Sequence, residues 1–355
     1  MMKYVVGITF LSLLSFSSQV FGQASTCTQT LRLVQATYEQ GRLHELEGQM
    51  AGCLRSGFDI QQKVQAYRYL TLAYIYLEEP EKADAAMLEL LNADYFFKPN
   101  DAVDPAEFIA LYRKFRVDPL FRVGIRLGPT ATMPAMQEVF YAGSNALGNG
   151  KFAPKVGFSL GLAFEKDFPG FIKNFSIAPE IVFITRSYSY SNPLLTENNQ
   201  SPGTAVISQD PNLLKQSWLD LNLLVQYKLS ESKFNPYISI GPGIGLLLKS
   251  SNNIATEVDG QGAITGSDID TKSSYNSLAY SAIISVGSKI RLGGFYLTGD
   301  IRYQYGLNNV VNESSRSNPE ALFDYGYVPS NYRQNNFTIN VGLVIPYFSP
   351  KKLIN

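Results

Sequence analysis

The sequence is poor in charge and nearly devoid of histidine and cysteine. Of its 355 residues, 17% are charged, and the 30 basic residues balance the 30 acidic ones, so the formal net charge is zero. A chain without excess positive charge lacks the electrostatic footprint of a nucleic-acid binder. The single histidine, His44, has no second histidine with which to build a metal site or a catalytic triad. We therefore expect no nucleic-acid partner, no metal, no cofactor and no catalytic residue.

Motifs that carry chemistry are missing as well. The sequence has no Gly-x-Ser-x-Gly elbow, no phosphate-binding loop and no Cys-x-x-Cys pair. What it has in abundance is glycine and aromatic residues: 28 Gly, 22 Tyr and 22 Phe. That mixture, with so little charge, suits a β structure whose outer face meets something less polar than water.

Residues 1–22 have the pattern of a secretory signal peptide. Lys3 precedes an apolar stretch over 5–16, and small residues stand near Gly22, where we expect cleavage. The alternative is a membrane anchor, but the apolar core is short for a bilayer span and a polar segment follows it at once. Export would leave Cys27 and Cys53 as a pair in an oxidising compartment. They form either a disulfide or two buried free thiols.

Residues 23–97 read as a module of short antiparallel helices. Their apolar residues recur at helical spacing, and turn signals stand at Gly41, Gly57, Pro80 and Pro99. We expect a connecting helix within 98–120, where Asp104, Pro105 and Glu107 have the spacing of a capping box.

Part of this module resembles a tetratricopeptide repeat. Over 62–95, large and small residues fall where such a repeat places its packing positions, and a weaker copy covers 31–46. Stacked repeats expose a concave surface that binds peptides or partner proteins, whereas two repeats alone can form a compact cap with a buried aromatic core. Both interpretations remain open for the packing or binding residues Tyr67, Leu70, Tyr74, Ala83 and Met87.

From residue 121 the apolar period changes from helical to two. Eight segments alternate between apolar and small or polar residues, and residues 218–229 show the clearest alternation. The segments are 121–128, 155–165, 175–190, 217–230, 236–249, 277–292, 295–310 and 336–348. A soluble β-sandwich would also alternate.

The connection lengths favour a membrane barrel over a sandwich. Connections after the second, fourth and sixth segments are short, whereas those after the first, third, fifth and seventh are much longer, such as 190–216 and 252–276. An up-and-down outer-membrane barrel shows this alternation, with turns in the periplasm and loops outside. The chain is thus predicted to be an α+β multidomain protein: an N-terminal helical-hairpin module in the periplasm, an eight-stranded antiparallel transmembrane β-barrel over 121–348, and a periplasmic tail over 349–355.

Two sets of residues follow from this assignment. Aromatic residues near segment ends would form girdles at the membrane interfaces: Phe121, Phe164, Tyr227, Phe295, Tyr303, Tyr305, Tyr347 and Phe348. An eight-stranded barrel is only wide enough for its own side chains, and charges inside it are costly unless paired. We expect an internal network of ion pairs, in preference to a transport or proton-relay site, from Arg122, Arg126, Glu165, Glu180, Arg186, Asp220, Lys228, Lys289, Arg291, Asp300 and Arg302.

The repeated motifs Val-Gly-Phe-Ser-Leu-Gly-Leu-Ala-Phe (156–164) and Tyr-Ile-Ser-Ile-Gly-Pro-Gly-Ile-Gly (237–245) carry a family resemblance. Residues 121–348 resemble the PorT-like outer-membrane barrels of Bacteroidota, with an OmpA-type eight-stranded barrel. The resemblance implies residence among the lipids of a Gram-negative outer membrane. It leaves three functions open: a non-catalytic anchor for a module that binds a periplasmic protein, as in secretion or assembly machinery; a small transporter or porin; and a surface adhesin acting through its long loops.

Overall fold

The computed structural model divides the chain into two compact units. One holds Met1–Pro119 with Phe348–Asn355, and the other holds Leu120–Tyr347; we call them the helical unit and the barrel. The structure describes residues 21–140, 151–168, 174–191, 212–230, 232–253, 255–258, 262–265, 268–319 and 328–353. The expected signal peptide therefore lies almost entirely outside the described residues. Within them, no helix combines the length and apolarity needed to cross a membrane.

Local signals set the ends of the helices. Gly41 and Gly57 adopt positive φ angles of 76° and 135° in the turns between helices, a conformation that costs glycine little. Asp59 and Gln62 form a reciprocal capping box, and Pro80 occupies the first turn of its helix. The helical elements are α2 (Phe21–Glu39), η1 (Leu43–Glu45), α3 (Leu46–Arg55), α4 (Ile60–Tyr76), α5 (Pro80–Ala93) and α6 (Ala106–Tyr112).

Helices α4 and α5 form the hairpin that contains the repeat-like pattern of residues 62–95. Leu70, Tyr74, Ala83 and Met87 are buried in the core of the unit, while Tyr67 is partly buried and packs against it. Cys27 in the first half of α2 and Cys53 near the end of α3 are joined in a disulfide. The described part of the helical unit is therefore held by an apolar core and one covalent link.

The connecting segment differs from its predicted form. Asp104 does not cap α6, whose N-cap is Pro105 without a side-chain hydrogen bond. The carboxylate of Asp104 instead accepts hydrogen bonds from Arg68 Nε at 2.6 Å and from the backbone N–H of Asn100 at 2.7 Å. The capping-box expectation was wrong because a guanidinium on α4 competes for the carboxylate, which sequence spacing alone does not reveal.

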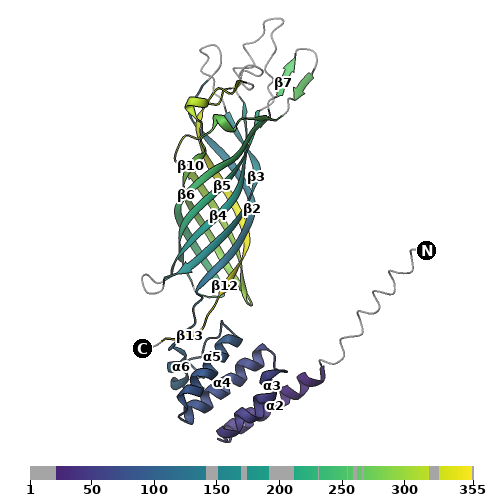
Figure 1. Cartoon of the computed structure of the whole chain (residues 1–355), viewed down its shortest axis with the longest axis vertical. Helices are drawn as coiled ribbons and strands as arrows, with labels where there is room; N and C mark the ends of the chain where they lie inside the picture. Colours follow the sequence, from purple (N-terminus) through teal and green to yellow (C-terminus); the bar gives the residue numbers. More distant parts are fainter. Residues whose placement is uncertain are drawn as a thin grey trace, which may run out of the picture. The chain divides into compact units, whose positions relative to one another are not determined.

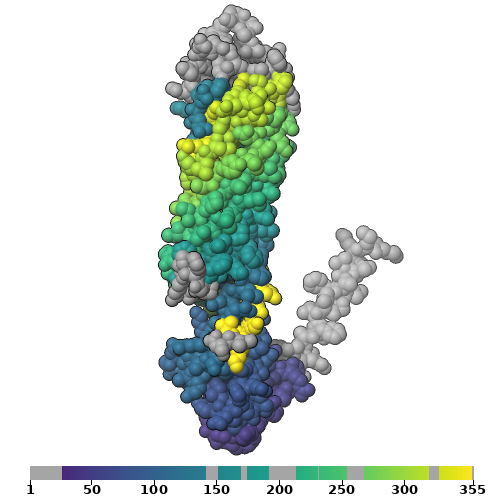
Figure 2. Space-filling view, turned by 60° about the vertical axis from the view of Figure 1, so that its left-hand side comes forward, coloured from purple at the N-terminus to yellow at the C-terminus, as the bar shows by residue number. Residues whose placement is uncertain are grey.

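The last residues of the chain belong to the helical unit. Strand β13 (Lys351–Lys352) pairs antiparallel with β1 (Phe115–Arg116), and Lys352 forms an ion pair with Asp84 on α5. Phe348 stacks on Tyr95, with ring centroids 5.2 Å apart. In Figure 2 these yellow C-terminal residues lie against the blue helices of this unit. Residues expected to form a free tail thus complete a two-stranded sheet, and Phe348 does not join a barrel girdle.

The barrel is a closed ring of eight antiparallel strands, which are inclined to the long axis of the barrel, as Figure 1 shows. Consecutive strands pair, and the pairing of β12 with β2 closes the ring. This confirms the predicted strand number and order. The strands are β2 (Phe121–Glu138), β3 (Lys151–Asp167), β4 (Phe175–Ser191), β5 (Asn212–Lys228), β6 (Phe234–Asn253), β10 (Leu278–Leu292), β11 (Phe295–Gly306) and β12 (Asn331–Tyr347).

The two ends of the barrel differ in their connections. Short connections follow β3, β5 and β10, and we call this the turn end; the longer connections lie at the loop end. Small elements decorate the loop end: β7 (Ala255–Val258) paired with β8 (Gly262–Thr265), β9 (Ile269–Asp270), η2 (Lys272–Ser274) and η3 (Glu313–Ser315). Phe121 at the start of β2 pairs with Tyr347 at the end of β12, so the chain enters and leaves the barrel at the turn end.

Candidate functional site

The barrel interior is the most chemically elaborate part of the described chain. Alternate residues of each strand point inward, so parity alone brings charged side chains from most of the eight strands into one narrow space. They gather in three layers between the turn end and the loop end. Each layer pairs cations with carboxylates.

The layer nearest the turn end is built around Asp167, the last residue of β3. Its two carboxylate oxygens accept hydrogen bonds from Arg122 at 2.9 and 2.7 Å, a bidentate arrangement. Lys228 on β5 donates to the same carboxylate at 2.6 Å. One carboxylate thus joins β2, β3 and β5.

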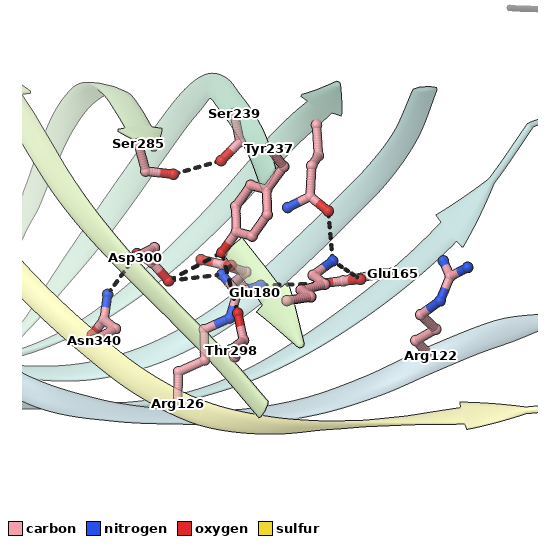
Figure 3. Close-up of polar contacts among 12 residues, drawn as sticks. Arg122, Arg126, Glu165, Glu180, Tyr237, Ser239, Ser285, Thr298, Asp300 and Asn340 are labelled. Carbon is pink, nitrogen blue, oxygen red and sulfur yellow. Dashed lines mark hydrogen bonds and ion pairs between the residues drawn. The ribbon is translucent and has the colours of Figure 1, made fainter. Parts of the chain in front are cut away.

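The central layer is the most buried. The Glu165 side chain has no solvent exposure and accepts hydrogen bonds from Lys289 Nζ at 2.5 Å and Arg126 Nη2 at 2.9 Å. The other terminal nitrogen of Arg126 donates to Glu180 at 2.7 Å, and Arg302 donates to that same carboxylate at 2.7 Å. The charges therefore alternate in sign along a connected chain, and Figure 3 labels its central members Glu165, Arg126 and Glu180.

Neutral groups add hydrogen bonds to this layer, although the Nε atoms of Arg126 and Arg302 are buried without a hydrogen-bond partner among the described residues. Asp300 accepts from Asn340 at 3.0 Å and lies 3.4 Å from the hydroxyl of Tyr237. Gln226 accepts a second hydrogen bond from Lys289, at 2.6 Å, and the Lys289 ammonium lies 4.9 Å from the centre of the Tyr237 ring. Such shared partners are what a buried charge requires if it is not to destabilise the fold.

The third layer lies toward the loop end. Arg186 donates to both oxygens of Asp220, at 2.9 and 2.6 Å, and to Gln334 at 3.0 Å. Its guanidinium also lies over the ring of Trp218, 4.7 Å from the ring centre. Arg is suited to this position because one planar group can pair with a carboxylate through one nitrogen, donate to an amide through another, and stack on an aromatic face.

Beyond this layer an apolar cluster fills the loop end, and we call it the aromatic plug. The hydroxyls of Tyr188 and Tyr332 are hydrogen-bonded at 2.5 Å, and residues from the loop-end connections pack beside them. The buried members of the plug are Ile184, Tyr188, Leu214, Trp218, Leu247, Tyr275, Ala279, Val310, Val311 and Tyr332.

Little free space remains inside. A cavity lined by Arg126, Asn222 and Arg302 among others has a volume of about 20 Å³, which is room for a single water molecule. The interior ion pairs join six cations to five carboxylates, so the charges nearly cancel. Among the described residues, no group of three His, Cys, Asp or Glu could hold a metal ion. The arrangement is suited to filling and bracing a barrel.

The outer wall has the opposite character. Every strand of the ring carries exposed Val, Ile, Leu or Phe side chains, and several are about half exposed, such as Leu127 at 53%, Leu221 at 53% and Ile240 at 61%. Aromatic rings cluster at the turn end, where Phe121 stacks on Phe164 and on Tyr347 with centroids 5.0 Å apart in both pairs. An apolar surface of this extent is stable against lipid and unstable against water.

Comparison with known proteins agrees with this geometry. Residues 115–312 match the family model described as "Outer membrane protein beta-barrel domain". The chain belongs to this family. It is an outer-membrane β-barrel protein, and the charged layers are the interior of that barrel. No protein with a curated description matches the sequence.

Solved structures of outer-membrane proteins are similar to this outer-membrane barrel. The protein OprG from Pseudomonas aeruginosa is 13% identical, with a TM-score of 0.37, and the match covers 65% of this chain and 98% of OprG. Neisserial surface protein A is 13% identical, with a TM-score of 0.32 and coverage of 64% and 97%. A major outer membrane protein from Thermus thermophilus is 12% identical, with a TM-score of 0.32 and coverage of 64% and 99%.

The structure brings together ten of the eleven interior residues expected from sequence, since each of them takes part in the three layers. Arg291 is the exception: it lies half-buried at the turn end of β10, and none of the ion pairs described above includes it. Sequence reasoning missed Asp167, which it placed in a turn, and Tyr237. Each of them lies an even number of residues from an inward-facing residue of its strand, so the alternation of inward and outward positions could have identified both.

Proposed function

We propose that this outer-membrane protein is a closed, non-catalytic anchor whose helical unit binds a periplasmic protein. The observation that supports the anchor role is the filled lumen: among the described residues of the barrel, ion-pair layers, the aromatic plug and a cavity of only about 20 Å³ occupy the interior. A barrel that is solid inside offers the membrane a stable span and leaves binding to parts outside its wall.

Chain topology supports a periplasmic position for the helical unit. Short turns of outer-membrane barrels face the periplasm. The chain enters and leaves this barrel at the turn end, through Phe121 and Tyr347, and both continuations belong to the helical unit. A disulfide between Cys27 and Cys53 suits the oxidising periplasm.

The helical hairpin of α4 and α5 supports the binding role. Its buried residues Leu70, Tyr74, Ala83 and Met87 occupy the positions that a tetratricopeptide-like repeat uses for packing, which would leave the outer faces of its helices free for a partner. We infer that the partner is a component of envelope secretion or assembly machinery.

Planar bilayer recording of the purified full-length protein tests the anchor role. We expect a silent bilayer after verified insertion, with a sixteen-stranded porin as the conducting control, because such porins have an aqueous channel. Stepwise conductance through the inserted protein would contradict the proposal and favour a small transporter or porin instead.

A further inference from the structure

The helical unit contains a groove lined mainly by polar side chains. It lies between α2 and α4 and has a volume of about 310 Å³. Glutamines dominate its lining: Gln35 on α2, and Gln61, Gln62 and Gln65 on α4. The Tyr69 ring and the Leu31 side chain add apolar contact area.

The walls of the groove are fixed in place. Gln62 donates a hydrogen bond to the hydroxyl of Thr28 at 2.9 Å, which ties α4 to α2, and the Asp59 capping box fixes the first turn of α4. One residue before Thr28, the Cys27–Cys53 disulfide attaches α2 to α3. The groove is therefore preformed, and a ligand would not have to order its walls.

Two of the glutamines are available to a ligand. The side chains of Gln61 and Gln65 are exposed and form no hydrogen bond within the described part of the chain. Each amide carries a donor and an acceptor, which match the C=O and N–H of a peptide group. Residues four apart on a helix are separated by about 6 Å along its axis, close to the ~6.7 Å repeat of alternate residues in an extended chain.

We propose that this groove binds an extended, uncharged polypeptide segment; this deepens the proposed function, on which it rests, by naming the ligand class. The charges at the groove, Arg32 and Asp59, are of opposite sign, and the Asp59 carboxylate already caps α4, so the groove does not select a strongly charged ligand. The segment lies along α4 with its backbone amides on Gln61 and Gln65.

A glycan fits the groove less well. Sugar rings pack against exposed faces of aromatic side chains, and the lining offers one aromatic ring, Tyr69. That ring is already engaged with Tyr38, at a centroid distance of 5.3 Å. The amide-rich lining and the occupied ring favour a polypeptide.

The disulfide gives the groove a dependence on redox state. Without the bond between Cys27 and Cys53, α2 loses its covalent attachment to α3, and this wall of the groove is held to α4 by noncovalent contacts alone, such as the Gln62–Thr28 hydrogen bond. Binding should therefore weaken when the bond is removed, even if the remaining core keeps α4 and α5 folded.

Fluorescence anisotropy with the full-length protein in nanodiscs tests the proposal. The probe is a pool of fluorescein-labelled heptapeptides with blocked ends, composed of Ser, Thr, Asn, Gln, Ala and Val. We expect saturable binding that weakens at least about tenfold in the double variant Gln61→Ala, Gln65→Ala, since two hydrogen bonds are lost. The matched control Gln40→Ala removes an exposed glutamine outside the groove and should bind like the wild type.

A second variant, Cys27→Ser with Cys53→Ser, should also bind less tightly, and circular dichroism of each variant separates a binding defect from unfolding. Labelled chitin tetrasaccharide replaces the peptide pool in a parallel titration. Absence of peptide binding, equal binding by the double glutamine variant, or binding of the saccharide alone would each overturn the proposal. These outcomes are independent of the bilayer recording, so a conducting barrel that binds peptides would contradict the anchor role only.

Discussion

Replacing Glu165 by glutamine tests whether the charged layers hold the barrel together. Glu165 is fully buried and compensates two cations, Lys289 at 2.5 Å and Arg126 at 2.9 Å. Removing its charge leaves six interior cations with four carboxylates, and Lys289 loses the one ion pair described for it. Removing one partner of a buried ion pair costs about 3–5 kcal/mol. Glutamine can still accept one hydrogen bond, so we expect a loss near the lower limit, about 3 kcal/mol.

The chain provides its own probe for this measurement. Its single tryptophan, Trp218, is fully buried in the aromatic plug, so its emission reports barrel unfolding. Urea titration in lipid vesicles should show a midpoint about 1.5 M lower for Glu165→Gln than for the wild type, given a denaturant slope of about 2 kcal/mol/M. The control Glu107→Gln changes an exposed carboxylate of the helical unit and should leave the midpoint unchanged.

A double-mutant cycle decides the mechanism. Combining Glu165→Gln with Lys289→Met removes both partners, so the double variant should be more stable than the sum of the single losses predicts, by at least about 1 kcal/mol. The reasoning is refuted if Glu165→Gln costs less than about 1 kcal/mol, or if the two losses simply add.

Two further predictions concern a strand glycine and a half-buried tyrosine. A Cβ at Gly128 would overlap the backbone carbonyl oxygen of Ile339, so Gly128→Val should lose the folded, heat-modifiable band in gel electrophoresis. The control Gly294→Ala places its Cβ in open space and should keep that band. A folded Gly128→Val barrel would contradict the strand packing. Burial, aided by the charge of Asp118, raises the pKa of Tyr112 from 10.0 to about 12. The folded state therefore retains this proton longer than the unfolded state, so the stability that Tyr112 contributes to the helical unit should be lost between pH 10 and 12. Tyr112→Phe should make the loss over this range smaller, and the raised pKa values of Tyr38, Tyr67, Tyr69 and Tyr74 account for what remains. A difference titration at 295 nm, wild type minus Tyr112→Phe, that gives a pKa near 10 would contradict the half-buried position.

Much of the barrel could be read from sequence because a strand has only two faces. Once residues 218–229 assign Leu to the outside, Asp220 must point inward, and the same parity places Arg186 and Asp300. The alternation of short and long connections between the segments predicted the order of the strands. Neither inference needs any knowledge of which side chains meet across the lumen.

The specific partners could not be predicted, because they depend on how far each strand is shifted along its neighbours. Asp167 was missed since β3 extends two residues past its expected end, and those two residues place the carboxylate within reach of Arg122 and Lys228. Asp104 likewise matches a local capping pattern, yet its carboxylate accepts a hydrogen bond from Arg68, 36 residues away in the sequence. Local signals define elements, whereas long-range ion pairs depend on register.

The pairing of β1 with β13 makes the barrel an insertion inside another folded unit. Residues 120–347 interrupt a unit whose first part is made before them and whose last part is made after them. Two covalent connections therefore lead from that unit to the barrel, and a single proteolytic cut in either one leaves the other intact. The order of synthesis adds a second effect: the two-stranded sheet forms only after the final barrel strand has been made, so its presence marks a chain in which every barrel strand has been produced.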